Sequence, residues 1–152
     1  MKKEGKCLFT PLVRYIYTDG SLHHLAYVRE QLERDVLRDV DGVFPRDYLG
    51  SWAKTLTVNE AEYWAIILAL RDAIHIGVEQ AIILSDSELV IRQLNGRYAV
   101  RKPSLRVLYN KVQDLLKQIE AVFEYVPREK NKAGWLLDGI KREGKKLALY
   151  GA

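Results

Sequence analysis

Cysteine and long apolar runs are scarce in this sequence. Cys7 is the one cysteine among 152 residues, which excludes an internal disulfide framework and a zinc site built from several thiolates. No apolar run approaches the roughly 20 residues that a helix needs to cross a bilayer. The first ten residues, MKKEGKCLFT, also lack an apolar core of signal-peptide length. We therefore expect a cytoplasmic protein without a membrane partner.

Internal repeats, low-complexity tracts and Pro/Gly/Ser-rich linkers are absent as well. Their absence excludes a repeat array and offers no boundary at which to divide the chain. Apolar residues make up 48% of the chain, which excludes a disordered composition. A net charge of +4 is compatible with a polyanionic partner but does not identify one. We predict a single domain over residues 1–152, acting as a monomer.

The apolar patterns predict strands that alternate with helices in the second half of the chain. In order, the expected elements are a strand over 12–17, a helix over 59–76, a strand over 81–87, helices over 87–95 and 103–119, a strand over 121–127 and a helix over 132–137. Gly139 is expected to interrupt the last helix. Alternation of this kind indicates an α/β fold with a partly parallel sheet covered by helices.

Residues 22–50 allow two interpretations. Val28, Leu32, Val36 and Val40 recur every four residues, as they would in a helix. The Asp41-Gly42 pair is instead a turn signal between two strands. We favour two antiparallel strands joined at that turn, forming one edge of the sheet.

Two carboxylates lie where predicted strands end. Asp19 follows the first strand, and Asp86 lies at the end of the strand over 81–87. Because the carboxyl ends of neighbouring strands in an open α/β sheet border one crevice, we expect both acids there. Glu62, in the first turn of the helix over 59–76, can project into the same crevice. Such a group of acids needs cations nearby, and hard oxygen ligands suit Mg²⁺ or Mn²⁺.

Each of these acids also has a purely structural explanation. Asp19-Gly20 is a common turn dipeptide, Asn59 and Glu62 have capping-box spacing, and Asp86 can cap the helix that follows it. Their joint placement favours a metal site instead. A pair of metal ions can activate water and stabilise the leaving oxygen of a phosphoryl displacement, which is the chemistry of a nuclease.

Four segments carry a family resemblance: YTDGS at 17–21, TVNEAEY at 57–63, LSDSELVIRQLNGRY at 84–98 and YVPREKNKA at 125–133. In order and spacing they resemble the motifs of type 1 ribonuclease H. The resemblance implies an α/β fold, with a mixed five-stranded sheet flanked by helices. It implies an endonuclease that uses Mg²⁺ or Mn²⁺, as two ions, to cut the RNA strand of an RNA/DNA hybrid, leaving 3′-hydroxyl and 5′-phosphate ends. Catalytic and metal-binding roles are carried onto Asp19, Glu62 and Asp86.

The sequence departs from that family at the fourth acid. The family places an Asp four residues after the Asn of its REKN-like motif, and counting from Asn131 reaches Trp135. An indole cannot ligate a hard cation. Asp138 lies three residues further along, on nearly the same helical face, and is our candidate for the fourth catalytic and metal-binding residue. The alternatives are a site of three carboxylates, or an Asp138 that is simply an exposed residue near a helix end.

Polar and basic residues around the motifs are expected to contact the nucleic acid. The substrate-binding candidates are Ser21, Asn59, Arg97, Lys102 and Asn131. Arg97 and Lys102 lie in a basic loop that can pair with phosphates, although a solvated loop is an equal alternative. The glycine-rich stretch that usually follows TDGS is replaced by Leu22-His23-His24. At most one of these histidines can face the crevice, because adjacent strand residues point to opposite faces.

The sequence therefore predicts a Mg²⁺-dependent endonuclease acting on RNA/DNA hybrids. A second hypothesis is a hybrid- or double-stranded-RNA-binding module whose catalytic centre is impaired at the fourth carboxylate. A third is a related nuclease that acts on another nucleic acid.

Overall fold

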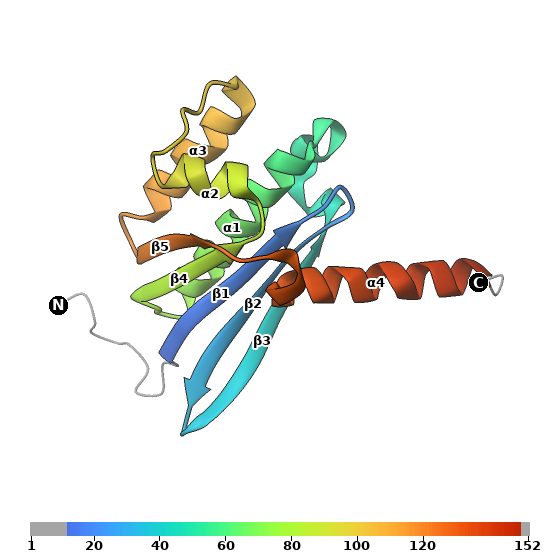
Figure 1. Ribbon diagram of the computed structural model, residues 1–152, viewed down its shortest axis with the longest axis horizontal. Helices are drawn as coiled ribbons and strands as arrows, with labels where there is room; N and C mark the ends of the chain where they lie inside the picture. The colour runs from blue at the N-terminus through green and yellow to red at the C-terminus, as the bar shows by residue number, and fades with distance from the viewer. Residues whose placement is uncertain (1–11, 150–152) are drawn as a thin grey trace.

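A computed structural model describes residues 12–149 of the chain, with side chains as far as Lys145 (Figure 1). Its sheet has five strands in the order β3-β2-β1-β4-β5. They are β1 (Leu12–Gly20), β2 (His24–Glu33), β3 (Val36–Pro45), β4 (Gln80–Ser85) and β5 (Glu120–Tyr125). The first three strands pair antiparallel, whereas β4 pairs parallel with both β1 and β5. The expected mixed five-stranded sheet is confirmed, and Cys7 lies outside the described residues.

Helices cover both faces of this sheet. One face carries α1 (Val58–His75), α2 (Glu88–Leu94) and α3 (Pro103–Leu115), and the other carries α4 (Lys132–Leu149). Alternation along β2 separates the two cores: Leu25 and Tyr27 pack on the α1 side, while Ala26 and Val28 pack on the α4 side. Two 3-10 helices, η1 (Arg46–Thr55) and η2 (Arg128–Lys130), complete the described elements. No helix in the described part of the chain is long and apolar enough to cross a membrane.

The strand prediction for residues 22–50 is confirmed, but the predicted turn is wrong. The chain reverses at Arg34 and Asp35, whose φ angles are 52° and 65°, and Asp41-Gly42 lies inside β3. Gly42 pairs with Tyr27, and a Cβ at position 42 would lie 2.5 Å from the Tyr27 ring. A close approach between strands, rather than a turn, explains this glycine.

The last helix is longer than the sequence predicted. Gly139 does not end it, and α4 continues to Leu149. A glycine inside a helix costs only about 1 kcal/mol relative to alanine, and the charged residues that follow, Lys141 to Lys145, are mostly good helix formers. Figure 1 shows the far half of α4 extending beyond the sheet, so only its first turns build the region around the carboxylates.

Candidate metal centre

Three elements bring Asp19, Glu62 and Asp86 together. Asp19 is the second-last residue of β1, Asp86 directly follows β4, and Glu62 lies near the start of α1. One oxygen from each carboxylate lies within 4.8 Å of the other two. Asp19 is 3% exposed and Glu62 7% exposed, so two of the three acids are shielded from water. The predicted convergence of these three side chains is what the structure shows.

Glu62 is held in place by the end of β1. The backbone N–H of Gly20 donates to Glu62 Oε1 at 2.8 Å. A Cβ at position 20 would lie 2.2 Å from the carbonyl oxygen of Ala61, so only glycine permits this contact between β1 and α1. The capping explanation for Glu62 is wrong, because Thr57 and Glu60 form the capping box of α1. The Glu62 carboxylate is therefore directed at the other acids.

The pKa values of the cluster reflect its burial. Burial is the largest cause that raises the pKa of Asp19, to about 6, and the negative charge of Asp86 adds to it. Burial also raises the pKa of Glu62 well above its usual range, with Asp19 and Asp86 contributing. Because these acids lie close together, they do not readily ionise at the same time, and a nearby cation stabilises their ionised forms. Their oxygen donors fit Mg²⁺ or Mn²⁺.

Arg128, in η2, is the residue that the sequence analysis missed. Its Nη1 donates to Asp19 Oδ2 at 2.8 Å and to Asp86 Oδ2 at 3.1 Å, and its Nη2 donates to Asp138 Oδ1 at 3.0 Å. The guanidinium thus joins three of the four predicted acids. The sequence could have pointed to Arg128 through its position in the YVPREKNKA motif, three residues before Asn131 and just before α4 begins.

Asn131 lies behind the carboxylates. It is fully buried, and its Nδ2 donates to the Thr18 carbonyl at 2.9 Å and to Asp86 Oδ2 at 3.0 Å. Its Oδ1 accepts from the backbone N–H of Ala133 at 3.1 Å, at the start of α4. These contacts favour a positioning role for Asn131, and direct contact with substrate stays a prediction.

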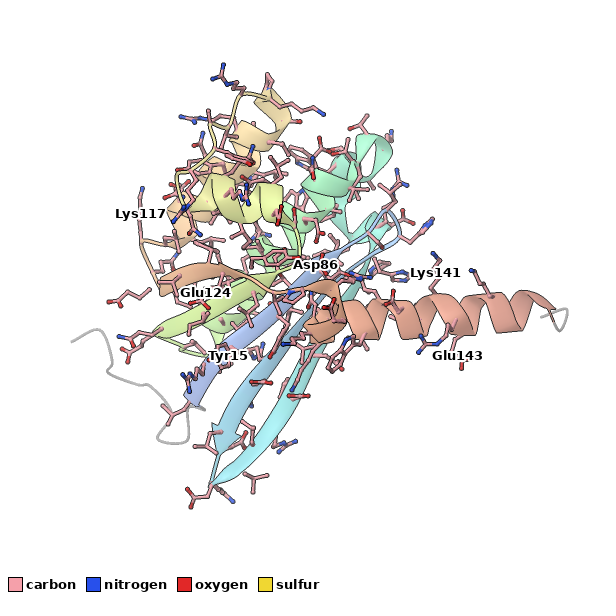
Figure 2. The ribbon with its side chains drawn as sticks, viewed as in Figure 1. Tyr15, Asp86, Lys117, Glu124, Lys141 and Glu143 are labelled. Carbon is pink, nitrogen blue, oxygen red and sulfur yellow. The ribbon has the colours of Figure 1, made fainter. Side chains whose placement is uncertain are left out.

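Asp138 and Trp135 lie on the α4 side of the centre. Figure 2 shows Asp86 close to the first turns of this helix. The Asp138 side chain is 49% exposed and is bound by Arg128. Among the described residues, the group of acids close enough to share one ion contains Asp19, Glu62 and Asp86 without Asp138. Trp135 is half-exposed, and its Nε1 donates to the Glu129 carbonyl at 3.0 Å.

The remaining predicted substrate contacts are not drawn into the cluster. Ser21 stabilises its own turn, because its Oγ donates to the His24 carbonyl and accepts from the backbone N–H groups of His23 and His24. Asn59, Arg97 and Lys102 are exposed. Asn59 is in the first turn of α1, three residues before Glu62, while Arg97 and Lys102 lie in the segment between α2 and α3. Their contacts with nucleic acid stay predictions.

Comparison with known proteins gives the fold and motifs a context. A family model described as reverse transcriptase-like matches residues 34–136. Bifunctional protein Rv2228c of Mycobacterium tuberculosis is 42% identical over 76 residues, which make up 49% of this chain and 21% of that protein. Ribonuclease HI of Halobacterium salinarum is 35% identical over 77 residues, 50% of this chain and 39% of that protein. The matched part of the chain is thus less than half the length of either relative.

Solved structures show the same architecture. The N-terminal RNase H domain of Rv2228c from Mycobacterium tuberculosis aligns at a TM-score of 0.61 and 27% identity, covering 86% of this chain and 96% of that one. RNase H1 of Halobacterium salinarum aligns at 0.63 and 26% identity, covering 80% and 89%. LC11-RNase H1, which was isolated from compost and solved in complex with an RNA/DNA hybrid, aligns at 0.61 and 27% identity, covering 78% and 88%.

Proposed function

Because the chain belongs to the ribonuclease H family, we propose that it is a metal-dependent endoribonuclease that cuts the RNA strand of RNA/DNA hybrids and leaves 3′-hydroxyl and 5′-phosphate ends. One observation carries the proposal: Asp19, Glu62 and Asp86 meet within 4.8 Å at the carboxyl end of the sheet. They come from the family's ordered motifs. The hybrid bound to LC11-RNase H1 supports the substrate class. Cys7 supports a cytoplasmic location, since a lone cysteine suits a reducing compartment.

Asp19, Glu62 and Asp86 are the residues that would hold Mg²⁺ or Mn²⁺. A divalent ion bound there supplies activation of water and stabilisation of the charge that develops in phosphoryl transfer. Two ions need a fourth oxygen ligand, for which the sequence predicts Asp138; the alternative is that Asp138 only anchors Arg128, from whose Nη2 it accepts a hydrogen bond. The rest of the chain positions these groups: Gly20 holds Glu62 through its N–H, and Asn131 holds Asp86. Such supporting contacts fix the orientation of metal ligands.

Substrate contacts are proposed on the exposed surface around the cluster. Asn59 stands on the first turn of α1 and can reach a sugar near the scissile bond, where the 2′-hydroxyl distinguishes RNA from DNA. Ser21 borders the cluster at the end of β1. Arg97 and Lys102 offer positive charge to phosphates, which gives affinity without sequence preference.

The test is cleavage of a labelled RNA/DNA hybrid in Mg²⁺ or Mn²⁺, with double-stranded RNA and double-stranded DNA as comparison substrates. We expect cutting of the RNA in the hybrid alone. Asp86→Asn removes a ligand charge and is expected to lower the rate at least about 100-fold while hybrid binding persists. The matched control is Asp114→Asn, the same change at an exposed position on α3 that pairs with Lys117. Loss of activity in both variants would contradict the proposal.

A second candidate is a hybrid-binding module without catalysis. Two observations favour it: Trp135 stands where the family has its fourth acid, and the Arg128 guanidinium is paired with two of the three clustered acids, Asp19 and Asp86. If the unaltered chain and Asp86→Asn both bind hybrid and neither cuts it, this second function replaces the first.

A further inference from the structure

The guanidinium of Arg128 lies inside the carboxylate centre. One nitrogen, Nη1, binds the Oδ2 atoms of both Asp19 and Asp86, and the other, Nη2, binds Asp138. Asp19 is almost fully buried, and the Asp86 side chain is 12% exposed. One arginine thus joins acids from the ends of β1 and β4 and from α4, and it offsets part of their negative charge.

A metal ion and this guanidinium compete for the same oxygens. Mg²⁺ binds carboxylate oxygens at about 2.0–2.1 Å, whereas Nη1 already lies 2.8 and 3.1 Å from Asp19 Oδ2 and Asp86 Oδ2. An ion shared by these oxygens from the same side would overlap Nη1. A cation approaching from another side would still face the like charge of Arg128 at short range.

On the basis of the proposed metal site, we propose that Arg128 competes with the metal ion for the same carboxylates. The Arg128 guanidinium must leave Asp19 and Asp86 before a divalent cation binds there. The side chain has room to do so, since it is 48% exposed. In this arrangement Asp138 anchors the guanidinium and is not itself a metal ligand. The chain thereby links metal affinity to the position of one arginine.

Gly134 shows that the fold accommodates the guanidinium. A Cβ at this position of α4 would lie 2.9 Å from Arg128 Nη1 and 3.1 Å from Cζ. Gly134→Ala should therefore displace the guanidinium while every charge in the protein is kept. Alanine also favours the helix, so this variant is expected to fold.

The test measures Mn²⁺ binding to the full chain without nucleic acid. Electron paramagnetic resonance and calorimetry, both at fixed pH, give the affinity. Arg128→Gln is expected to tighten Mn²⁺ binding at least about tenfold, since it removes both the occupant and its charge. Gly134→Ala is expected to tighten binding several-fold. Arg106→Gln on α3 is the matched control for the loss of one positive charge, and its affinity should equal that of the unaltered chain.

Asp138→Asn decides between its two roles by the sign of the effect. As the anchor of Arg128, its loss tightens Mn²⁺ binding; as the fourth metal ligand, its loss weakens binding. Thermal unfolding in EDTA checks that each variant folds, and Arg128→Gln should unfold at a lower temperature there. Unchanged or weaker Mn²⁺ binding in both Arg128→Gln and Gly134→Ala overturns the inference, as does weaker binding in Asp138→Asn. Hybrid cleavage is measured separately: failure of the proposed function appears as absent cutting in every variant, whatever its Mn²⁺ affinity.

Discussion

The two helices that reach the carboxylate centre differ in how firmly they are held. The start of α1 is fixed by a reciprocal capping box, and most of its residues are buried beneath the sheet. Only the first turns of α4 pack on the opposite face, through Ala133 and Leu137, and the remainder extends outward (Figure 1). Glu62, which α1 carries, is therefore preset. The groups on the α4 side, Arg128 and Asp138, are half-exposed and can rearrange.

Glu62→Gln is expected to have the largest effect on cleavage, because it changes the acid that α1 holds rigidly in the centre. We expect hybrid cleavage to fall at least about 100-fold through loss of a ligand charge. The pKa of Glu62 is raised by burial, so the neutral amide should not lower the midpoint of thermal unfolding in EDTA. Glu60→Gln, in the same helical turn, is the matched control and should cleave normally. Equal activity in both variants would remove Glu62 from the site.

Asn131→Ala should destabilise the protein at the start of α4 and leave Asp86 less firmly positioned. The substitution removes the side-chain donor to the Thr18 carbonyl and leaves Asp86 Oδ2 with Arg128 as its remaining donor, which costs about 1–3 kcal/mol of unfolding free energy. Cleavage is expected to fall about 10–100-fold, as for other residues that orient metal ligands. Urea unfolding and hybrid cleavage measure the two effects. A variant with full activity at reduced stability would show that Asn131 does not position Asp86.

Asp19→Asn should make metal-free stability depend on pH in a defined direction. Burial raises the pKa of Asp19 from 3.8 to about 6 in the folded chain, so the folded state binds this proton more readily than the unfolded state. The resulting stabilisation is fully present below about pH 3.8 and is lost as pH rises through about 6. In EDTA, Asp19→Asn should therefore gain stability over the unaltered chain as pH rises from 4 to about 7. A constant difference in melting temperature across this range would contradict the prediction.

Gly139→Ala tests the middle of α4, where the helix leaves the sheet, and has the smallest expected effect. The nearest neighbour of a Cβ there is the Arg142 side chain at 3.8 Å, an ordinary contact. Helix propensity alone should then raise the unfolding free energy by about 0.5–1 kcal/mol. Mn²⁺ affinity and cleavage should stay the same, in contrast with Gly134→Ala. A change in affinity would mean that position 139 also affects the carboxylate centre.

The sequence predicted what depends on local pattern and on where parallel strands end. Asp19 and Asp86 could be placed together because both lie at the carboxyl ends of strands, and Glu62 because its helix precedes the second of them. The hairpin turn was misplaced because Gly42 serves the Tyr27 ring on the neighbouring strand, a contact that no local pattern reveals. Arg128 was missed for a similar reason, since its partners lie up to 109 residues away. The length of α4 was underestimated because Gly139 was given more weight than the charged helix formers that follow it.

Gly20 has a wider consequence for how this protein can change. The end of β1 and the start of α1 touch through backbone atoms, with no space for even a methyl group between Gly20 and the Ala61 carbonyl. The spacing between Asp19 and Glu62 is thus set by main-chain contact and not by the volume of core side chains. Large-to-small changes deeper along α1 can reduce stability without moving the two acids apart. The chain can accumulate such changes in its interior, whereas position 20 accepts no other residue.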